Sequence, residues 1–218
     1  DRDVVALYPR GRWHIDPVRR RADHRRATVT LVPTATVDSL DRDILRNAQQ
    51  GDRASFALLV ESYYPRALRF AMQMLGARED AEEAVQDAFI RVHDNLARFR
   101  ADAPFDPWFF RILGNRCRTL AEKRKRHHQM MEYSDVIPDV AQDTDSVAPD
   151  DELARDVYRV LAELPADQRE AFLLRHVNDM DYEEMMLVTG ARGSTLRMRV
   201  KRAVDTLRSK LRREAVHD

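Results

Sequence analysis

The sequence predicts an all-α fold in which two small helical domains are joined by an acidic, flexible linker. Apolar residues recur at the spacing of amphipathic helices through most of residues 39–126 and 153–218. The 218 residues include only 6 Gly and are 34% charged, a composition that disfavours a large sheet. Residues 127–154 hold eight acidic side chains and no Lys or Arg, which is typical of a linker. We therefore predict an N-terminal extension (1–38), a first domain (39–126), a linker (127–152) and a second domain (153–218).

The N-terminal extension is expected to be flexible, because it has three Pro, five Arg between Arg19 and Arg26, and little hydrophobic periodicity. In the first domain, apolar residues over 40–48 mark one helix, and Gly51-Asp52 is typical of a helix end followed by an N-cap. A second helix is predicted through 56–63. Pro65 suits a first helical turn and should begin a third helix that ends at Gly76.

The next two helices of the first domain carry opposite charge. A helix over about 79–96 places apolar side chains on one stripe and acidic side chains on its outer face. A break at 99–107 leads into a helix from Trp108 to about Arg126, with Asp106 as its N-cap. The formal charge is −4 over 78–97 and +6 over 98–126.

The second domain has the layout of a helix-turn-helix. Helices are predicted at 153–164, 171–177, 182–189 and 194–211, with Asp167 as a cap in the turn before the second. Short helices followed by a long basic helix are typical of this DNA-binding motif.

The formal net charge is zero, from 37 basic and 37 acidic residues, yet a partner responds to local clusters within about 8–10 Å. Residues 191–218 carry +6 and favour a phosphate-bearing partner. Arg197 with Lys201, and Met198 with Arg202, form neighbouring strips near the start of the last helix, where recognition helices meet base edges. The alternative is a solvated terminal helix.

Aromatic and basic residues interleave in the helix at 108–126, a combination suited to unpaired DNA bases and their backbone. The alternative places those aromatics in the core. The acidic face of Asp80, Glu83, Gln86 and Asp87 would repel DNA, so it is either a contact for a basic protein surface or a solvated helix face.

No motif indicates catalysis, a metal or a cofactor, so the sequence predicts that the protein is not an enzyme. Cys117 is the only cysteine, and His127 and His128 lack paired ligands. A protein without an internal disulfide, a signal peptide or 18 consecutive apolar residues is expected in the cytoplasm, without membrane insertion.

The motifs resemble those of bacterial sigma factors of the extracytoplasmic-function group. The resemblance covers roughly 40–213 and rests on five stretches in the family's order: DAEEAVQDAF (80–89), WFFRI with Asn115 (108–115), LPADQREAFLLR (164–175), YEE (182–184) and TLRMRVKRA (195–203). It implies sigma domain two at 39–126 and sigma domain four at 153–218. The implied function is to direct core RNA polymerase to promoters and to melt the minus-10 element.

The resemblance also assigns residues to partners. Polymerase contacts, to the beta-prime coiled coil with further contact to the beta subunit, are expected from Asp80, Glu83, Gln86, Asp87 and Phe89. Minus-10 contacts are expected from Phe99, Arg100, Trp108, Arg111, Asn115, Arg118 and Arg124, with Trp108 and Ile112 nearest the core. Minus-35 contacts are expected from Thr195, Arg197, Met198, Arg199, Lys201 and Arg202. An anti-sigma factor is a further expected partner, and the linker is expected to enter the polymerase cleft.

Three residues depart from the family pattern. Ser194 replaces a Gly, Met186 replaces a small residue, and Met198 replaces a small polar residue, so that position can make only apolar or weak acceptor contacts. Two other function classes stay open: a stand-alone helix-turn-helix regulator of duplex DNA, and an adaptor whose basic helices bind acidic proteins.

Overall fold

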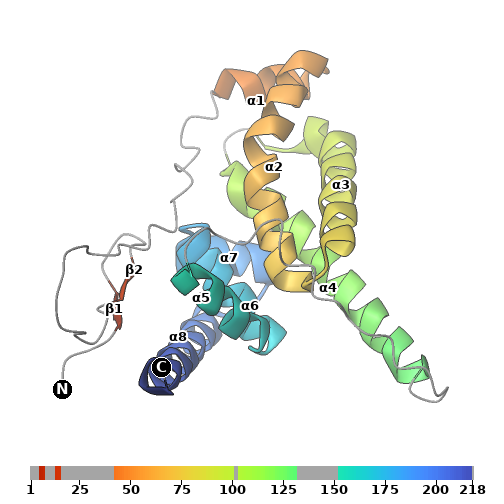
Figure 1. Cartoon of the computed structure of the whole chain (residues 1–218). Coiled ribbons are helices and arrows are strands. Elements are labelled where there is room, and N and C mark those ends of the chain that lie inside the picture. The colour runs from red at the N-terminus through yellow and green to blue at the C-terminus, as the bar shows by residue number, and fades with distance from the viewer. Residues whose placement is uncertain (1–4, 8–12, 16–41, 101–102, 132–151, 218) are drawn as a thin grey trace. The chain divides into compact units, whose positions relative to one another are not determined.

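The computed structural model describes residues 5–7, 13–15, 42–100, 103–131 and 152–217. Both domains are all-α, as predicted (Figure 1). The N-terminal segment adds a strand pair that was not predicted: β1 (Val5–Leu7) and β2 (Trp13–Ile15) pair antiparallel, with Val5 opposite Ile15. The rest of the predicted N-terminal extension and most of the predicted linker lie outside the described residues.

The first domain is built from four α-helices: α1 (Arg42–Gln49), α2 (Arg53–Leu75), α3 (Arg78–Asn95) and α4 (Phe105–Met131), with the 3-10 turn η1 (Leu96–Arg98) after α3. Helix α2 packs against α1, α3 and α4, and α3 packs against α4. Their shared core is aromatic, because Tyr63, Phe70, Phe109 and Phe110 are almost fully buried. Ring centroids of Phe70 and Phe110 lie 5.4 Å apart in an edge-to-face contact, a favourable geometry.

Both predicted ends of α2 are confirmed, but the break at Pro65 is wrong. The Asp52 carboxylate accepts hydrogen bonds from the Ser55 amide at 2.9 Å and hydroxyl at 2.6 Å, and Gly76 ends the helix with φ +75°. Pro65 lies inside one continuous helix. An interior proline costs about 3 kcal/mol, and the packing of Tyr63 and neighbouring residues into the core offsets that cost.

Helix α4 begins earlier and ends later than expected. Asp106 is not its N-cap, since the helix already begins at Phe105 and the carboxylate contacts α2 instead. At the other end the helix continues to Met131, five residues into the predicted linker, because the linker's acidic residues begin only at Glu132 and Gln and Met are good helix formers.

The second domain contains α5 (Glu152–Ala162), α6 (Ala166–Phe172), the π-helical turn η2 (Leu173–Val177), α7 (Tyr182–Thr189) and α8 (Gly193–His217). Helices α5 and α6 both pack on α8. The prediction for α7 is confirmed at both ends, but Asp167 is not a cap. The residue at the cap of α6 is Pro165, and Asp167 forms an ion pair with α8.

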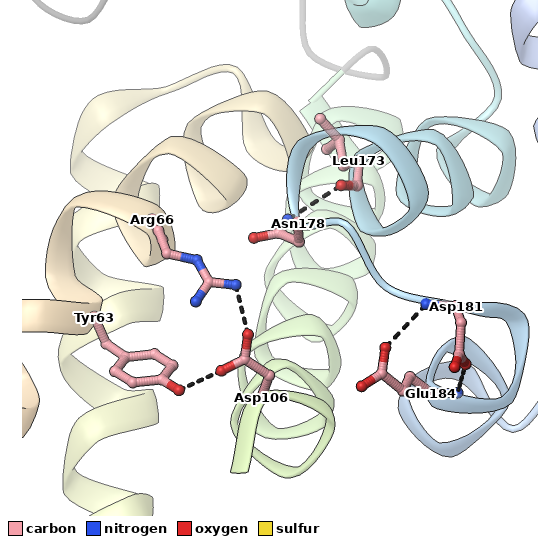
Figure 2. Close-up of polar contacts among 7 residues, drawn as sticks. All are labelled: Tyr63, Arg66, Asp106, Leu173, Asn178, Asp181 and Glu184. Carbon is pink, nitrogen blue, oxygen red and sulfur yellow. Dashed lines mark hydrogen bonds and ion pairs between the residues drawn. The ribbon is translucent and has the colours of Figure 1, made fainter. Parts of the chain in front are cut away.

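Polar groups fix the turn between η2 and α7 (Figure 2). The amide and side chain of Asn178 both donate to the carbonyl oxygen of Leu173, at 3.0 and 3.1 Å. Asp181 and Glu184 form a capping box: Asp181 Oδ1 accepts from the amide of Glu184 at 2.8 Å, and Glu184 accepts from the amide of Asp181 at 2.9 Å. This box sets where α7 begins.

No helix in the described part of the chain is both long and apolar enough to cross a membrane.

Candidate nucleic-acid interface

The acidic face predicted on α3 is largely occupied by arginines of α4. Arg116 lies 2.7 Å from Glu83 and 2.8 Å from Asp87, and Arg124 lies 3.3 Å from Asp80. These ion pairs connect α3 to α4 and weaken the negative field that the carboxylates present to a partner. Arg124, which was predicted to contact DNA, thus faces the acidic helix of its own domain.

A groove between α2 and α3 adjoins that face. Ile90 and Tyr64, at its edge, are 51% and 40% exposed, although large apolar side chains are usually covered. Phe89, predicted as a polymerase contact, is 8% exposed and belongs to the core as well as to the groove. The sequence did not predict that residues of α2 line this groove, because only tertiary packing brings α2 beside α3. The groove is lined by Phe56, Val60, Tyr64, Glu82, Gln86, Phe89, Ile90 and His93.

The break before α4 rests on an aromatic cluster. Phe99, expected at the DNA, is buried, with its ring centroid 4.7 Å from Trp108 and 5.5 Å from Phe105. Trp108, expected nearest the core, is the more exposed of the two predicted aromatic contacts. The structure therefore reverses their expected order. Gln49 of α1 fixes the start of the break by donating to the carbonyl oxygens of Leu96 at 3.2 Å and Phe99 at 2.7 Å.

The other end of the break is fixed at Asp106 (Figure 2). Arg66 donates to one carboxylate oxygen at 2.6 Å, and the Tyr63 hydroxyl donates to the other. Arg66 is only 4% exposed, and its guanidinium also lies 5.3 Å from the Phe110 ring centroid. Burial raises the pKa of Tyr63 above its usual range, and the Asp106 charge raises it further, so the phenol keeps the proton that it donates. Sequence analysis did not identify Tyr63 or Arg66.

One outward strip of α4 keeps the features predicted for DNA binding. Arg111 and Asn115 are exposed, and Arg118 is half-buried and donates to Asn115. The three lie one helical turn apart and so share a face. Arg100, in the break before α4, is also exposed.

Helix α8 turns its apolar side to the domain and its predicted contacts to solvent. Leu196, Val200 and Ala203 are buried. Along the opposite side the exposed residues are Ser194, Thr195, Arg197, Met198, Lys201 and Arg202. Arg199 differs from these, because it is partly covered and forms a 2.9 Å ion pair with Asp167.

Helix α7 positions the start of α8 through one tyrosine. The guanidinium of Arg197 lies 5.2 Å from the ring centroid of Tyr182, and that of Arg175 lies 5.4 Å from it. Arg175 also donates to the carbonyl oxygen of Met180 at 2.8 Å. These contacts connect η2, α7 and α8, which are the parts of the helix-turn-helix.

Beneath this motif lies a buried histidine. His176 is 8% exposed, and its ring centroid lies 5.0 Å from that of Phe172. Burial and, to a smaller extent, the charge of Arg175 together lower the pKa of His176 to about 4, so the imidazole is neutral near pH 7. In the part of the chain that the structure describes, no three His, Cys, Asp or Glu are grouped to hold a metal.

Comparison with known proteins agrees with this two-part arrangement. A model of sigma-70 region 2 matches residues 59–127, and one of sigma-70 region 4 matches residues 154–207. The RNA polymerase sigma factor NccH of Alcaligenes xylosoxydans xylosoxydans is 33% identical over 174 residues, covering 77% of this chain and 92% of NccH. The chain belongs to the extracytoplasmic-function sigma factors of the sigma-70 family.

Other relatives of this sigma factor support the assignment. The ECF RNA polymerase sigma factor SigW of Bacillus subtilis is 25% identical over 183 residues, covering 77% of this chain and 95% of SigW. The sigma factor RpoE of Bartonella quintana, solved in complex with the anti-sigma factor NepR, superposes with a TM-score of 0.60 at 25% identity, covering 72% of this chain and 96% of RpoE. The sigma factor functions in transcription initiation, and the stand-alone regulator is not favoured. Sigma factors are not enzymes.

Proposed function

We propose that the sigma factor divides its tasks among three surfaces. The groove between α2 and α3, with its acidic edge, binds the beta-prime coiled coil of core RNA polymerase. The break at 99–104 and the outward strip of α4 bind the melted minus-10 element, and α8 enters the minus-35 major groove. The observation that carries this proposal is that α4 and α8, in separate domains, each present basic and polar residues opposite a buried apolar side.

The docking surface combines apolar and polar character. Ile90 and Tyr64 offer apolar area to a helical partner, while Gln86 and Glu82 beside them offer polar contacts to its basic residues. Asp80, Glu83 and Asp87 are already paired with α4, so they contribute most to holding α4 in place.

The minus-10 surface consists of a fixed frame and exposed contacts. Gln49 and Asp106 hold the two ends of the break, and Phe99 and Trp108 support it from the core side. Arg100, Arg111, Asn115 and Arg118 are the side chains proposed to meet the strand.

Further partners follow from the family. The solved complex of RpoE with NepR supports an anti-sigma factor as a partner of this chain. We assign the acidic segment between α4 and α5, residues 132–151 of the predicted linker, to the polymerase cleft, with contact to the beta subunit. We assign the whole protein to the cytoplasm, where it acts without catalytic activity of its own.

Reconstitution with core polymerase tests the docking surface. Ile90→Ala and Gln86→Lys should weaken binding of core polymerase, measured by fluorescence anisotropy of the labelled sigma factor. Leu58→Ala is a matched control, because Leu58 is 50% exposed on α2 but does not line the groove. Equal losses in Leu58→Ala and Ile90→Ala would place the docking surface elsewhere.

The same system tests the division between the domains. Arg202→Ala should reduce promoter use that depends on the minus-35 element and leave core binding unchanged, and Arg199→Ala should do so more weakly because Asp167 already pairs with Arg199. Asp80→Lys and Asp87→Lys should weaken core binding by displacing α4. If all four variants lose core binding equally, the proposed division is wrong.

A further inference from the structure

The outward side of α8 carries a large apolar side chain near the start of the helix. Met198 is 48% exposed and follows the exposed Ser194 by four residues. It precedes the exposed Lys201 and Arg202 by three and four residues, so all four residues share one helix face. The core side of α8 is complete without Met198, since Leu196 and Val200 on either side of it are buried. Packing within the domain therefore does not explain a large apolar residue at this position.

The neighbours of Met198 along the chain are both held by their own domain. Arg197 lies over the Tyr182 ring at 5.2 Å, and Arg199 is ion-paired with Asp167 at 2.9 Å. Both cations are thereby restrained at the sides of the outward face. Met198 lies between them and is 48% exposed.

The chemistry of a thioether restricts what it can recognise in a major groove. Sulfur is a weak acceptor and methionine has no donor, so Met198 can pair only weakly with the donors on base edges and not at all with their acceptors. Covering those polar edges without pairing them costs free energy. The C5-methyl group of thymine is the apolar feature of the major groove, and it gains from contact with another apolar group.

We propose that Met198 reads the C5-methyl group of a thymine in the minus-35 element of this sigma factor. The inference rests on the proposed entry of α8 into the minus-35 major groove and adds which base feature is recognised. Lys201 and Arg202 supply phosphate or polar base contacts on the same face, while Met198 discriminates thymine from bases that lack the methyl group.

Deoxyuridine provides a direct test, because it differs from thymidine only by this methyl group. Holoenzyme reconstituted from the full chain and core polymerase selects its preferred duplexes from a library with a randomised minus-35 region. Each thymidine of the selected element is then replaced in turn by deoxyuridine, and affinity is measured by anisotropy. We expect one position at which the replacement weakens binding about fourfold, the change that corresponds to about 0.8 kcal/mol for one buried methyl-sized group.

Variants then assign that effect to Met198. Met198→Ala and Met198→Ser should abolish the deoxyuridine penalty at that position, whereas Met198→Leu should retain it. Met186→Ala is the matched control, since Met186 is also an exposed methionine, 41% exposed, but lies on α7. The Met186→Ala variant should show the same loss of affinity on deoxyuridine replacement as the wild type.

Four outcomes would overturn the inference. A minus-35 element without any methyl-sensitive position, or a penalty that persists in Met198→Ala, refutes methyl recognition while leaving the proposed function intact. A loss of core-polymerase binding in Met198→Ala with unchanged DNA recognition would assign the exposed side chain to a protein contact instead. If the holoenzyme selects no minus-35 sequence at all, the proposed role of α8 fails and the inference with it.

Discussion

The two domains treat their charged groups differently. In the first, cations are paired across helices: Arg66 with Asp106 between α2 and α4, and Arg116 and Arg124 with the acids of α3. In the second, Lys201 and Arg202 point outward from α8, and neither is ion-paired with any residue that the structure describes. The second domain also joins two helices by an ion pair, between Asp167 and Arg199, but it leaves Lys201 and Arg202 open to a partner, whereas Arg116 and Arg124 of α4 are already engaged.

Because of this difference, the formal charge of a segment does not give the charge that is available to DNA. Residues 98–126 and 191–218 both carry +6 in sequence. A phosphate approaching α4 must compete with carboxylates that already lie within 2.7–3.3 Å of Arg116 and Arg124, whereas α8 imposes no such competition at Lys201 and Arg202. The two segments thus differ in the charge that they offer to DNA, although their sums are equal.

Removing the acid of the buried pair should produce the largest effect. Asp106→Ala leaves the Arg66 guanidinium buried without its carboxylate, and we expect the first domain to lose about 3–5 kcal/mol of unfolding free energy. Urea unfolding followed by tryptophan fluorescence measures this, because Trp108 lies two residues away. Tyr63→Phe should cost only about 1 kcal/mol, since it removes one hydrogen bond and leaves the ion pair. A loss below 1 kcal/mol in Asp106→Ala would show that this pair does not stabilise the domain.

The second domain should instead respond to pH through His176. The folded pKa of about 4 lies below the ordinary value of about 6.5, so the folded state binds fewer protons than the unfolded state between these values. Stability is complete above pH 6.5 and falls as the pH drops towards 4, by at most about 1.4 kcal/mol per pH unit. Urea unfolding followed by circular dichroism at pH 7 and pH 5 measures the slope.

Variants separate His176 from other groups that titrate in the same range. His176→Leu should flatten the pH dependence of the unfolding free energy of the second domain, whatever the absolute stability of the variant. His93→Gln, at an exposed position in the first domain, should leave the slope unchanged. A wild-type slope that persists in His176→Leu would contradict the assignment.

The dependence of DNA affinity on salt should distinguish exposed cations from paired ones. Arg202→Ala should reduce the slope of log affinity against log salt concentration by about 1, as for the loss of one phosphate contact. Arg116→Ala should change that slope by much less, since Arg116 is already engaged by Glu83 and Asp87. The measurement is the affinity of the holoenzyme for promoter duplexes at several salt concentrations. Equal changes of slope in the two variants would contradict the distinction between paired cations on α4 and exposed cations on α8.

The smallest effect is expected at the partly exposed pair of Arg124 and Asp80. Both side chains are about one third exposed, so water screens the attraction, and Asp80→Asn should cost no more than about 1 kcal/mol of stability. The same urea titration that detects the effect of Asp106→Ala serves here. A loss of 3 kcal/mol or more would show that α3 and α4 depend on this ion pair as strongly as α2 and α4 depend on Arg66.

Sequence patterns located the helices well where the decisive groups are local. The cap at Asp52, the end at Gly76 and the bounds of α7 depend on residues within one turn, and they were predicted correctly. The errors at Pro65, Asp106 and Asp167 share a cause. Each residue has a favourable local role, as a helix start or a cap, that was outweighed by contacts with residues at least 30 positions away or by core packing on both sides.

Sequence alone determined the fold class from helical periodicity and the family from the order of its motifs. It also predicted the outward stripe of α8, because periodicity fixes which side chains share a face. Tertiary structure alone decided which charges and aromatics are available to a partner. Phe99 is buried, Arg124 faces α3, and Arg66 and Tyr63 hold Asp106, since ion pairs and aromatic packing join residues whose distance along the chain conceals their contact. Spacing along a helix specifies which side chains share a face, but contacts between helices decide which of those side chains stay available to a partner.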